Sequence, residues 1–197
     1  MIIYLFGMRL KDDDKQTALF EATVKLVNEI GFAASSVSKI AKQAGVSPAT
    51  IYVYYRNKED LLVSTYIEIK RQLGEAVMQD FEPSLPIPDI LKNVWFKMFD
   101  YIGNHLDYFQ FTEQFANSPY SELVDKTDVE KYFEPLIETV LRGIQQKIIK
   151  DVNFDILTAF MVYPIMILSN PRLCRNIELN HEAIETAFQL AWDAIKR

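Results

Sequence analysis

The sequence is short of cysteine: Cys174 is the only one among 197 residues. A single cysteine excludes an internal disulfide and any zinc site that needs several cysteines, and it is typical of a reducing compartment. Glycine is also scarce, with six residues, and no stretch alternates apolar and polar residues in the manner of a half-buried strand. The sequence therefore predicts an all-α fold.

Long hydrophobic runs are absent as well. The longest, residues 156–168, is shorter than the roughly 20 residues that a membrane-spanning helix needs, and it is interpreted as a buried helix. The apolar run 2–6 has no basic region before it and is shorter than a secretory core. Residues 1–8 are interpreted as an N-terminal extension, with Met8 as an alternative natural start. We expect a cytoplasmic protein without a membrane partner.

Groups that carry catalysis are also few. His181 follows Glu178 at the spacing of a di-iron helix, but such a site needs a second copy and further carboxylates. Cys174 lies near Arg172 and Arg175, so oxidant sensing is an alternative, although an incidental thiol is favoured. No Ser/His/Asp grouping, phosphate loop or nucleotide-binding motif is found. The sequence therefore predicts no enzyme, no metal site and no cofactor.

Helical periodicity predicts about nine helices. Ser47, Asn57 and Asn180 are expected as N-caps, and Gly31 and Gly45 as helix ends. Pro164 is expected to kink a helix, and the proline-rich segment 82–88 is expected to be a linker or hinge. The expected helices cover residues 12–31, 36–45, a short stretch after Ser47, 58–80, 89–103, 106–116, 128–149, 154–169 and 180 to the C-terminus.

Charge is distributed unevenly along the chain. The whole sequence carries a net charge of −6, which speaks against nucleic acid as a partner. Residues 1–58, however, contain eight Lys and Arg against five Asp and Glu, a net charge of +3. Such asymmetry indicates a nucleic-acid-binding portion at the N-terminus.

The segment GVSPATIYVYYRNKEDL, residues 45–61, has the spacing of a helix-turn-helix. Ala41 is a small residue for close approach, Gly45 allows the tight turn, and Ile51 is an aliphatic anchor. At about 100° per residue, Tyr55 lies on the side of Ile51. The opposite face carries the small ridge Ala49, Thr50 and Val53, flanked by Tyr52 and Tyr54. Such a ridge suits a groove with polar walls.

Residues 36–62, SVSKIAKQAGVSPATIYVYYRNKEDLL, resemble the N-terminal DNA-binding domain of the TetR family of transcriptional regulators. The residues that carry the resemblance are Gly45, Val46, Ser47, Thr50, Tyr52, Tyr54, Tyr55, Lys58, Glu59 and Leu61. The strong match covers about the first third of the chain. It implies a three-helix DNA-binding domain over residues 9–57, followed by a larger helical domain for ligand binding and dimerisation over residues 58–197.

The resemblance also implies roles for single residues. Thr50, Tyr52, Tyr54, Lys58 and Ser36 match positions that contact phosphates, and Tyr55 matches a core position. Pro48, Ala49 and Val53 are expected to face the bases, where they can make only apolar contacts. The expected DNA-binding residues are Ser36, Ser47, Pro48, Ala49, Thr50, Tyr52, Val53, Tyr54 and Lys58. The implied function is that of a repressor on a pseudo-palindromic operator in double-stranded DNA; the alternative is a helical adaptor that has lost DNA binding or ligand response.

Two further partners follow from the resemblance. The apolar stretch 154–169 and the last helix fit the four-helix interface of a homodimer, and the alternative is that both fill the monomer core. A small hydrophobic effector, neutral or cationic, is expected to bind among aromatic residues and to shift the helix 58–80. The candidate ligand-binding residues are Trp95, Phe99, Tyr108, Phe111, Phe115, Tyr132, Phe160 and Tyr163.

Overall fold

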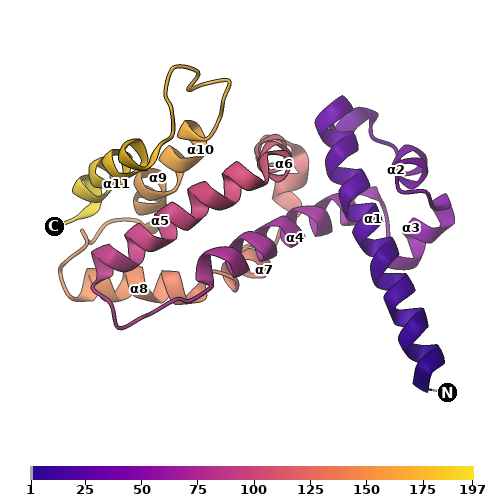
Figure 1. The fold of residues 1–197 in the computed structure, drawn as a ribbon, viewed down its shortest axis with the longest axis horizontal. Coiled ribbons are helices and arrows are strands. Elements are labelled where there is room, and N and C mark those ends of the chain that lie inside the picture. The colour runs from indigo at the N-terminus through magenta and orange to yellow at the C-terminus, as the bar shows by residue number, and fades with distance from the viewer. Residues whose placement is uncertain (1) are drawn as a thin grey trace. The chain divides into compact units, whose positions relative to one another are not determined.

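The computed structural model describes the backbone of residues 2–197 and the side chains of residues 14–197. Over this range the chain is helical, and the described backbone contains no strand, only an isolated bridge between Ile149 and Lys196. The expectation of an all-α fold is confirmed. The elements, labelled in Figure 1, are α1 (Ile2–Ala34), α2 (Val37–Gln43), α3 (Pro48–Tyr54), α4 (Lys58–Met78), α5 (Ile87–Asn104), α6 (Leu106–Ala116), the 3-10 helix η1 (Pro119–Leu123), α7 (Lys126–Glu130), α8 (Glu134–Gln145), α9 (Phe154–Met161), α10 (Tyr163–Leu168) and α11 (His181–Ile195).

The elements form two compact units. The recognition unit comprises the chain up to Lys70 together with Leu106–Asp128, and the C-terminal unit comprises Arg71–His105 with Val129–Arg197. The division therefore falls inside α4, and α6 belongs to the recognition unit although it follows α5 in the chain. The domain boundary expected between residues 57 and 58 was based on function, DNA binding before it and ligand binding after it. It is not a boundary between packed units, and it stays a prediction.

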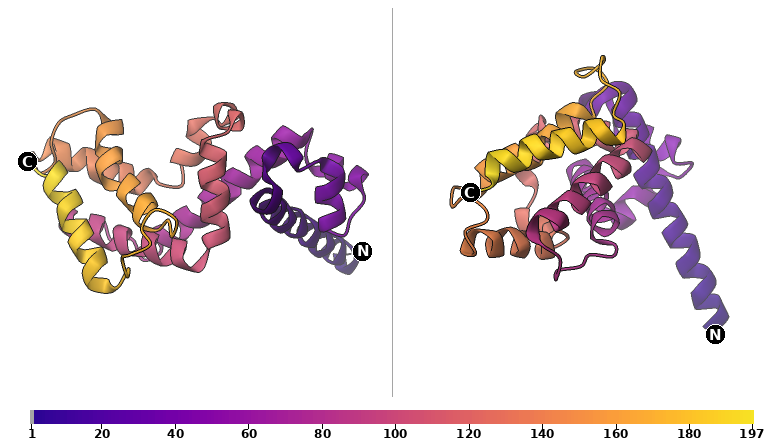
Figure 2. Two further views of the ribbon diagram at one scale, coloured as in Figure 1. Left: turned by 90° about the horizontal axis from the view of Figure 1, so that it is seen from above. Right: turned by 60° about the vertical axis from the view of Figure 1, so that its left-hand side comes forward.

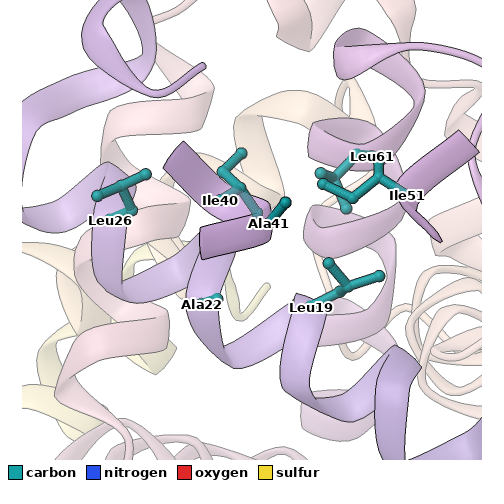
Figure 3. Packing of buried hydrophobic residues seen from close by; sticks show 7 residues of the cluster. All are labelled: Leu19, Ala22, Leu26, Ile40, Ala41, Ile51 and Leu61. Atoms are coloured by element: carbon teal, nitrogen blue, oxygen red, sulfur yellow. The ribbon is translucent and has the colours of Figure 1, made fainter. Parts of the chain in front are cut away.

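The recognition unit is organised around one apolar cluster, shown in Figure 3. Its side chains come from one face of α1, from α2 and α3, and from the first turn of α4: Leu19, Ala22, Leu26, Ile40, Ala41, Ile51 and Leu61. Spacings of three and four residues put the α1 members on one face, so that α2 and α3 close over it. On another side α6 packs against α1, where Tyr108 donates a 2.8 Å hydrogen bond to Glu21 and stacks edge-on against Phe20.

Helix α1 differs from its expected bounds at both ends. It begins at Ile2 rather than Asp12, because nothing in the preceding residues breaks a helix. At Gly31 the backbone has φ 76° and ψ 167°, outside helical geometry, and the element resumes to Ala34. This positive φ is easily adopted only by glycine, but its ψ is not that of the left-handed cap that the sequence suggested.

The C-terminal unit is built around α5. The helix buries Trp95, whose ring lies 5.7 Å from that of Phe188 on α11, and the Lys92 ammonium pairs with the Glu185 carboxylate at 2.7 Å. Figure 2 shows α11 alongside α9 and α5. The end of the chain is held by backbone hydrogen bonds from Lys150 to Ile195 and from Arg197 to Ile148, each 2.9 Å.

Two helices expected to be continuous are each divided. The stretch 128–149 forms α7 and α8, separated at residues 131–133, because Pro135 cannot donate the hydrogen bond that would carry the first helix into the second. The stretch 154–169 is interrupted at Val162, two residues before Pro164, and forms α9 and α10. These divisions raise the expected total of about nine helices to the eleven α-helices of the described chain. None of its helices has the length and hydrophobicity to cross a membrane.

Candidate DNA-binding surface and ligand cavity

The start of α3 is fixed by its own residues. Ser47 caps the helix by accepting the backbone N–H of Thr50 at 3.2 Å, and its hydroxyl lies 2.9 Å from that of Thr50. Pro48 occupies the first turn, where no N–H is needed. Gly45 precedes the cap with φ +70°. The turn and cap expected from the sequence are therefore confirmed, and they set the direction of α3.

The two faces of α3 differ sharply in exposure. Ile51 is fully buried in the cluster of Figure 3, whereas Tyr52 and Val53 are 58% and 75% exposed. Pro48 and Ala49 are exposed beside them. Because these exposed apolar and aromatic residues are neighbours on one helix face, the outward ridge of α3 is a candidate contact surface.

The two tyrosines of α3 and Tyr55, which caps its C-terminal end, have distinct surroundings. Tyr55 is half-buried against the cluster, and burial, followed by the nearby Asp60 carboxylate, raises the pKa of its phenol. Tyr54 also packs in part against the cluster, with its ring 6.4 Å from that of Tyr55. Tyr52 is the exposed member. Tyr55 packs against the core cluster, as its matching core position implies, and Tyr54 is half-buried beside it.

The start of α4 adds a cation. Asn57 accepts the backbone N–H of Asp60 at 2.8 Å, as expected for a cap. Asp60 in turn accepts the N–H of Arg56 at 2.8 Å rather than that of Asn57, and this backbone hydrogen bond holds the pKa of its carboxyl below the usual value. Lys58 donates to the Phe32 carbonyl at 2.6 Å. This bond fixes the ammonium at the end of α1 and leaves two of its three N–H groups for another acceptor.

The nine expected DNA-binding residues lie on three neighbouring pieces of the recognition unit. Eight are on α3, its cap or the start of α4, and Ser36 caps α2 by accepting the N–H of Lys39 at 3.3 Å. Sequence reasoning did not single out Lys39, Lys42 and Arg56, which are exposed. The positive balance of residues 1–58 was the signal that could have identified these three cations.

A cavity of about 220 Å³ lies within the C-terminal unit. Its walls come from α5, α7, α8, α9 and α10, with Ile195 of α11. Trp95, Glu130 and Thr158 are the only lining residues with polar side-chain atoms. Glu130 and Phe154 are exposed, so the cavity opens to solvent beside them. Such a space suits a small apolar molecule.

The eight candidate ligand-binding residues are not brought together. Trp95 lines the cavity, and Phe99 is buried next to it with ring centroids 5.8 Å apart. Tyr108, Phe111 and Phe115 are on α6 in the recognition unit, where Phe115 stacks on Tyr66. Phe160 and Tyr163 are 51% and 58% exposed. The residues that sequence reasoning missed lie on α8, where the spacing of Leu136, Ile137 and Val140 is the signal of an inward face.

Tyr132 lies next to the cavity rather than in its wall. Val129, Glu130 and Phe133 on either side of it are lining residues. A Cβ added at Gly74 of α4 would be 2.7 Å from the Tyr132 Cβ and 2.9 Å from its carbonyl oxygen. The glycine thus permits α4 to touch the segment between α7 and α8 directly.

The outer face of α10 and α11 forms an open groove of about 770 Å³. Phe160, Ile167 and Leu190 line it and are 51%, 51% and 69% exposed. The apolar residues of α11 lie in two environments: Phe188, Ala191 and Ile195 are buried within the unit, and Ile184 and Ala187 are partly exposed. Filling of the monomer core therefore applies to part of this helix, and the homodimer interface stays a prediction.

No group of three or more potential metal ligands is gathered among the side chains that the structure describes. Glu178 lies in the loop before α11 and His181 is its first residue, so the two are separated by the cap Asn180. Cys174 is a free, partly exposed thiol.

Comparison with known proteins agrees with this geometry. Residues 19–65 match the model of bacterial regulatory proteins of the tetR family, and residues 86–196 match a tetracyclin repressor-like C-terminal domain. A crystal structure of a TetR family transcription regulator from Marinobacter aquaeolei VT8 is 36% identical, covers 95% of this chain and 98% of its own, and superposes with a TM-score of 0.84.

One relative is named for fatty acid metabolism, and one similar structure contains stearoyl-CoA. The fatty acid metabolism regulator protein of Bacillus subtilis is 39% identical over 92 residues, which is 46% of this chain and 47% of that protein. The structure of FadR from Bacillus subtilis in complex with stearoyl-CoA is 24% identical, covers 91% of this chain and 98% of its own, and has a TM-score of 0.72, which shows the shared fold. From its matching N-terminal and C-terminal domains, the chain belongs to the TetR family of transcriptional regulators.

Proposed function

We propose that this protein is a homodimeric repressor that binds a pseudo-palindromic operator through α3 and leaves it when a small apolar molecule occupies the C-terminal unit. The observation that carries the DNA-binding part is the exposed ridge of α3 on a helix whose opposite face is fully buried. A helix held in this way suits the major groove, and two copies related by a two-fold axis suit two half-sites.

The chemistry of α3 sets the kind of readout. Pro48, Ala49 and Val53 offer only apolar contacts, and the Thr50 hydroxyl is already paired with Ser47. Direct hydrogen-bond readout of bases by α3 is therefore poor, and thymine methyl contacts together with DNA shape carry the preference. The phenol of Tyr52 and the ammonium of Lys58 supply phosphate contacts that fix the register.

Assembly is supported by the groove on α10 and α11. Side chains such as Leu190, at 69% exposure, are unfavourable on the surface of a monomer unless a partner covers them. A second copy of the same face is a suitable partner because a two-fold interface is self-complementary.

Coupling between ligand and DNA is supported by the contact at Gly74. An occupant of the cavity touches residues on both sides of Tyr132, and Tyr132 lies against α4 without a side chain between them. Helix α4 begins at Lys58, in the proposed DNA-binding surface. Displacement of Tyr132 would therefore bias a helix that carries a phosphate-contacting residue.

The test is equilibrium binding of the full-length protein to DNA upstream of its own coding sequence, compared with scrambled DNA of the same length. We expect a specific site bound at least a thousandfold more tightly than the scrambled DNA. Equal affinity for both sequences would favour the alternative of a helical adaptor. A protein that binds specifically but is released by no compound would leave a constitutive regulator.

A further inference from the structure

The last turn of α1 is held in place by its own side chains. The Phe32 ring lies edge-on to that of Phe111 on α6, at a centroid distance of 5.5 Å. The Ser35 hydroxyl, in a residue with no exposed surface, donates a 2.7 Å hydrogen bond to the Gly31 carbonyl. The carbonyl groups of this turn therefore have set directions. Carbonyls at the end of a helix lack intrahelical partners and need other donors.

Two lysine ammonium groups act as those donors. Lys58, at the start of α4, donates to the Phe32 carbonyl at 2.6 Å. Lys39, in the first turn of α2, donates to the Ala34 carbonyl at 3.0 Å. Lysine side chains can cap helix ends in this way, so each bond by itself has a purely structural explanation. The combination is less ordinary, because two cations from different helices are attached to carbonyls only two residues apart.

The two ammonium groups are close neighbours. Carbonyl oxygens two residues apart are separated by at most about 7 Å, so the two nitrogens lie within about 13 Å of each other. Neither Lys39 nor Lys58 has a carboxylate partner among the described side chains. Two cations fixed near each other without a counter-charge create a positive potential that attracts an anion.

The pair retains donors for such an anion. An ammonium group has three N–H groups, and each lysine uses one of them on its carbonyl. The bond from Lys39 to Ala34 is exposed to solvent, and the bond from Lys58 to Phe32 is partly buried. An anion can therefore approach Lys39 directly. Because the side chains are already attached, binding costs less rotational freedom than it would for two free lysines.

The pair adjoins the candidate DNA-binding surface. Lys58 belongs to that surface, and α2 is joined to α3 by the turn at Gly45. The surrounding part of the chain, residues 1–58, carries a net charge of +3. Each strand of DNA offers one phosphate for about every 3.4 Å of helix axis, so two ammonium groups within about 13 Å can contact the same strand.

From these observations we infer that Lys39 of α2 is a further contact to the DNA backbone, held beside Lys58 by the last turn of α1. This inference rests on the proposed function, because it adds a contact to the same DNA-binding surface. It extends that surface from α3 and α4 onto α2. A phosphate contact carries no base information, so Lys39 strengthens binding to any duplex and helps to fix the position of the protein on it.

Substitutions at Lys39 separate its charge from helix capping. Lys39→Gln keeps a donor for the Ala34 carbonyl and removes the charge, whereas Lys39→Arg keeps both. We expect Lys39→Gln to weaken binding of the full-length protein to a random-sequence duplex about threefold to tenfold, measured by fluorescence anisotropy. The slope of log affinity against log salt should fall by about one for each bound protomer. Lys39→Arg should stay within about twofold of the original affinity.

Lys25→Gln is the matched control. This exposed lysine of α1 lines a groove in which it is the only cation beside Glu21, Glu29 and Asp107. DNA is repelled by such a groove, so the salt slope should not change. If the slope is also unchanged in Lys39→Gln, the residue is only a structural cap and the inference is overturned, even if the thermal midpoint falls.

Contact can also be measured without a substitution. Reductive dimethylation with formaldehyde and cyanoborohydride modifies accessible lysines, and mass spectrometry gives the rate at each one. With duplex DNA at about nine times its Kd, modification of Lys39 and Lys58 should slow by up to about tenfold, while that of Lys25 stays the same. This measurement uses the original protein, so it decides the question even if a variant does not fold.

The outcomes separate the inference from the proposed function. Protection of Lys58 with equal rates at Lys39 in the presence and absence of DNA would reject the inference and retain the DNA-binding surface on α3 and α4. Absence of any DNA binding by the original protein would reject both.

Discussion

The two units of this protein treat their apolar residues in opposite ways. The recognition unit packs its cluster around Ile51 and exposes a narrow ridge of small residues and one phenol on α3. The C-terminal unit encloses a cavity and leaves aliphatic side chains of α10 and α11 exposed. Cavities and exposed apolar surface are unfavourable in an isolated chain, so the C-terminal unit is built for contacts that other molecules complete. The recognition unit fills its own apolar cluster, and its exposed ridge on α3 is the part left for another molecule.

The largest effect is expected from a charge in the exposed groove. Leu190→Glu should raise the dimer dissociation constant at least about a hundredfold, because a carboxylate would be buried against apolar side chains of a second copy. Operator affinity should fall with it. Sedimentation equilibrium at micromolar concentration measures the change.

The matched control is Leu141→Glu, which places the same charge on an exposed leucine of α8 outside the groove. This variant should remain dimeric. If Leu190→Glu is also dimeric at the same concentrations, the dimer does not use this face.

The next effect concerns the close approach of α4 to Tyr132. Gly74→Ala should destabilise the C-terminal unit by about 2 kcal/mol, because the new Cβ would meet the Tyr132 backbone at 2.9 Å. Gly103→Ala, in α5 with nothing within 4 Å of its Cβ, should instead be neutral or stabilise by about 0.5–1 kcal/mol. Urea unfolding followed by circular dichroism distinguishes the pair, and equal effects would remove the argument for direct contact.

The recognition unit contains a buried ammonium group, that of Lys70. Lys70 lies 5.3 Å from the centre of the Tyr66 ring, and burial lowers the pKa of its ammonium from 10.5 to about 8. Between these pH values the unfolded chain holds more protons than the folded one, so the free energy of unfolding should rise with pH. Below about pH 8 both states are protonated and this contribution has no slope.

We expect a rise of about 1–2 kcal/mol between pH 8 and 10, discounted from the full shift because part of the side chain still meets solvent. Lys70→Met should abolish the rise and be more stable than the original protein at pH 7. The raised pKa of Tyr55 acts in the opposite direction above its unfolded value near 10, so the comparison ends at pH 10. A wild-type stability that is flat from pH 8 to 10 would contradict the assignment.

The smallest effects are expected on the DNA-binding surface. Lys58→Ala and Tyr54→Phe should each weaken operator binding about threefold to tenfold, uniformly across sequences, because phosphate contacts carry no base information. The lysine change should also reduce the slope of log affinity against log salt by about one. Fluorescence anisotropy at several salt concentrations measures both quantities.

Arg172→Ala removes an exposed cation of the C-terminal unit and serves as the control, with no change expected in the salt slope. Tyr52→Phe can be compared with Tyr54→Phe, because the Tyr52 side chain is exposed and the Tyr54 side chain is partly packed against the cluster. Unchanged affinity in both Lys58→Ala and Tyr54→Phe would show that the mapping of α3 and α4 onto DNA is wrong.

The sequence predicted local structure best where a few neighbouring residues determine it. Ser47, Asn57 and Asn180 cap helices at the expected positions, because each cap depends on a side chain and the N–H three residues later. Pro164 was expected to kink a helix, but the helix is interrupted there. A proline that could be absorbed as a kink instead ends one helix and starts another, and the choice depends on what packs around it.

The candidate ligand site was predicted less well for a different reason. Aromatic composition does not reveal which unit a helix joins, and α6 turned its rings towards α1 and α4 instead of towards the cavity. The indole N–H of Trp95 is buried without an acceptor among the described residues because of contacts among helices far apart in sequence, so no local pattern contains it. The positions of cavities and buried donors depend on how all the helices pack together. No short segment of the sequence determines that packing.

The brevity of α7 has a consequence for rates. This helix has five residues, two of which, Val129 and Glu130, line the cavity beside its opening. A helix of one turn has almost no stability of its own, so it can unravel while the rest of the unit remains folded. We expect this unravelling to widen the existing opening, so that molecules enter and leave faster when residues 126–130 are unfolded. Backbone amides of that turn should therefore exchange with deuterium sooner than those of α8, and more slowly once the cavity is filled.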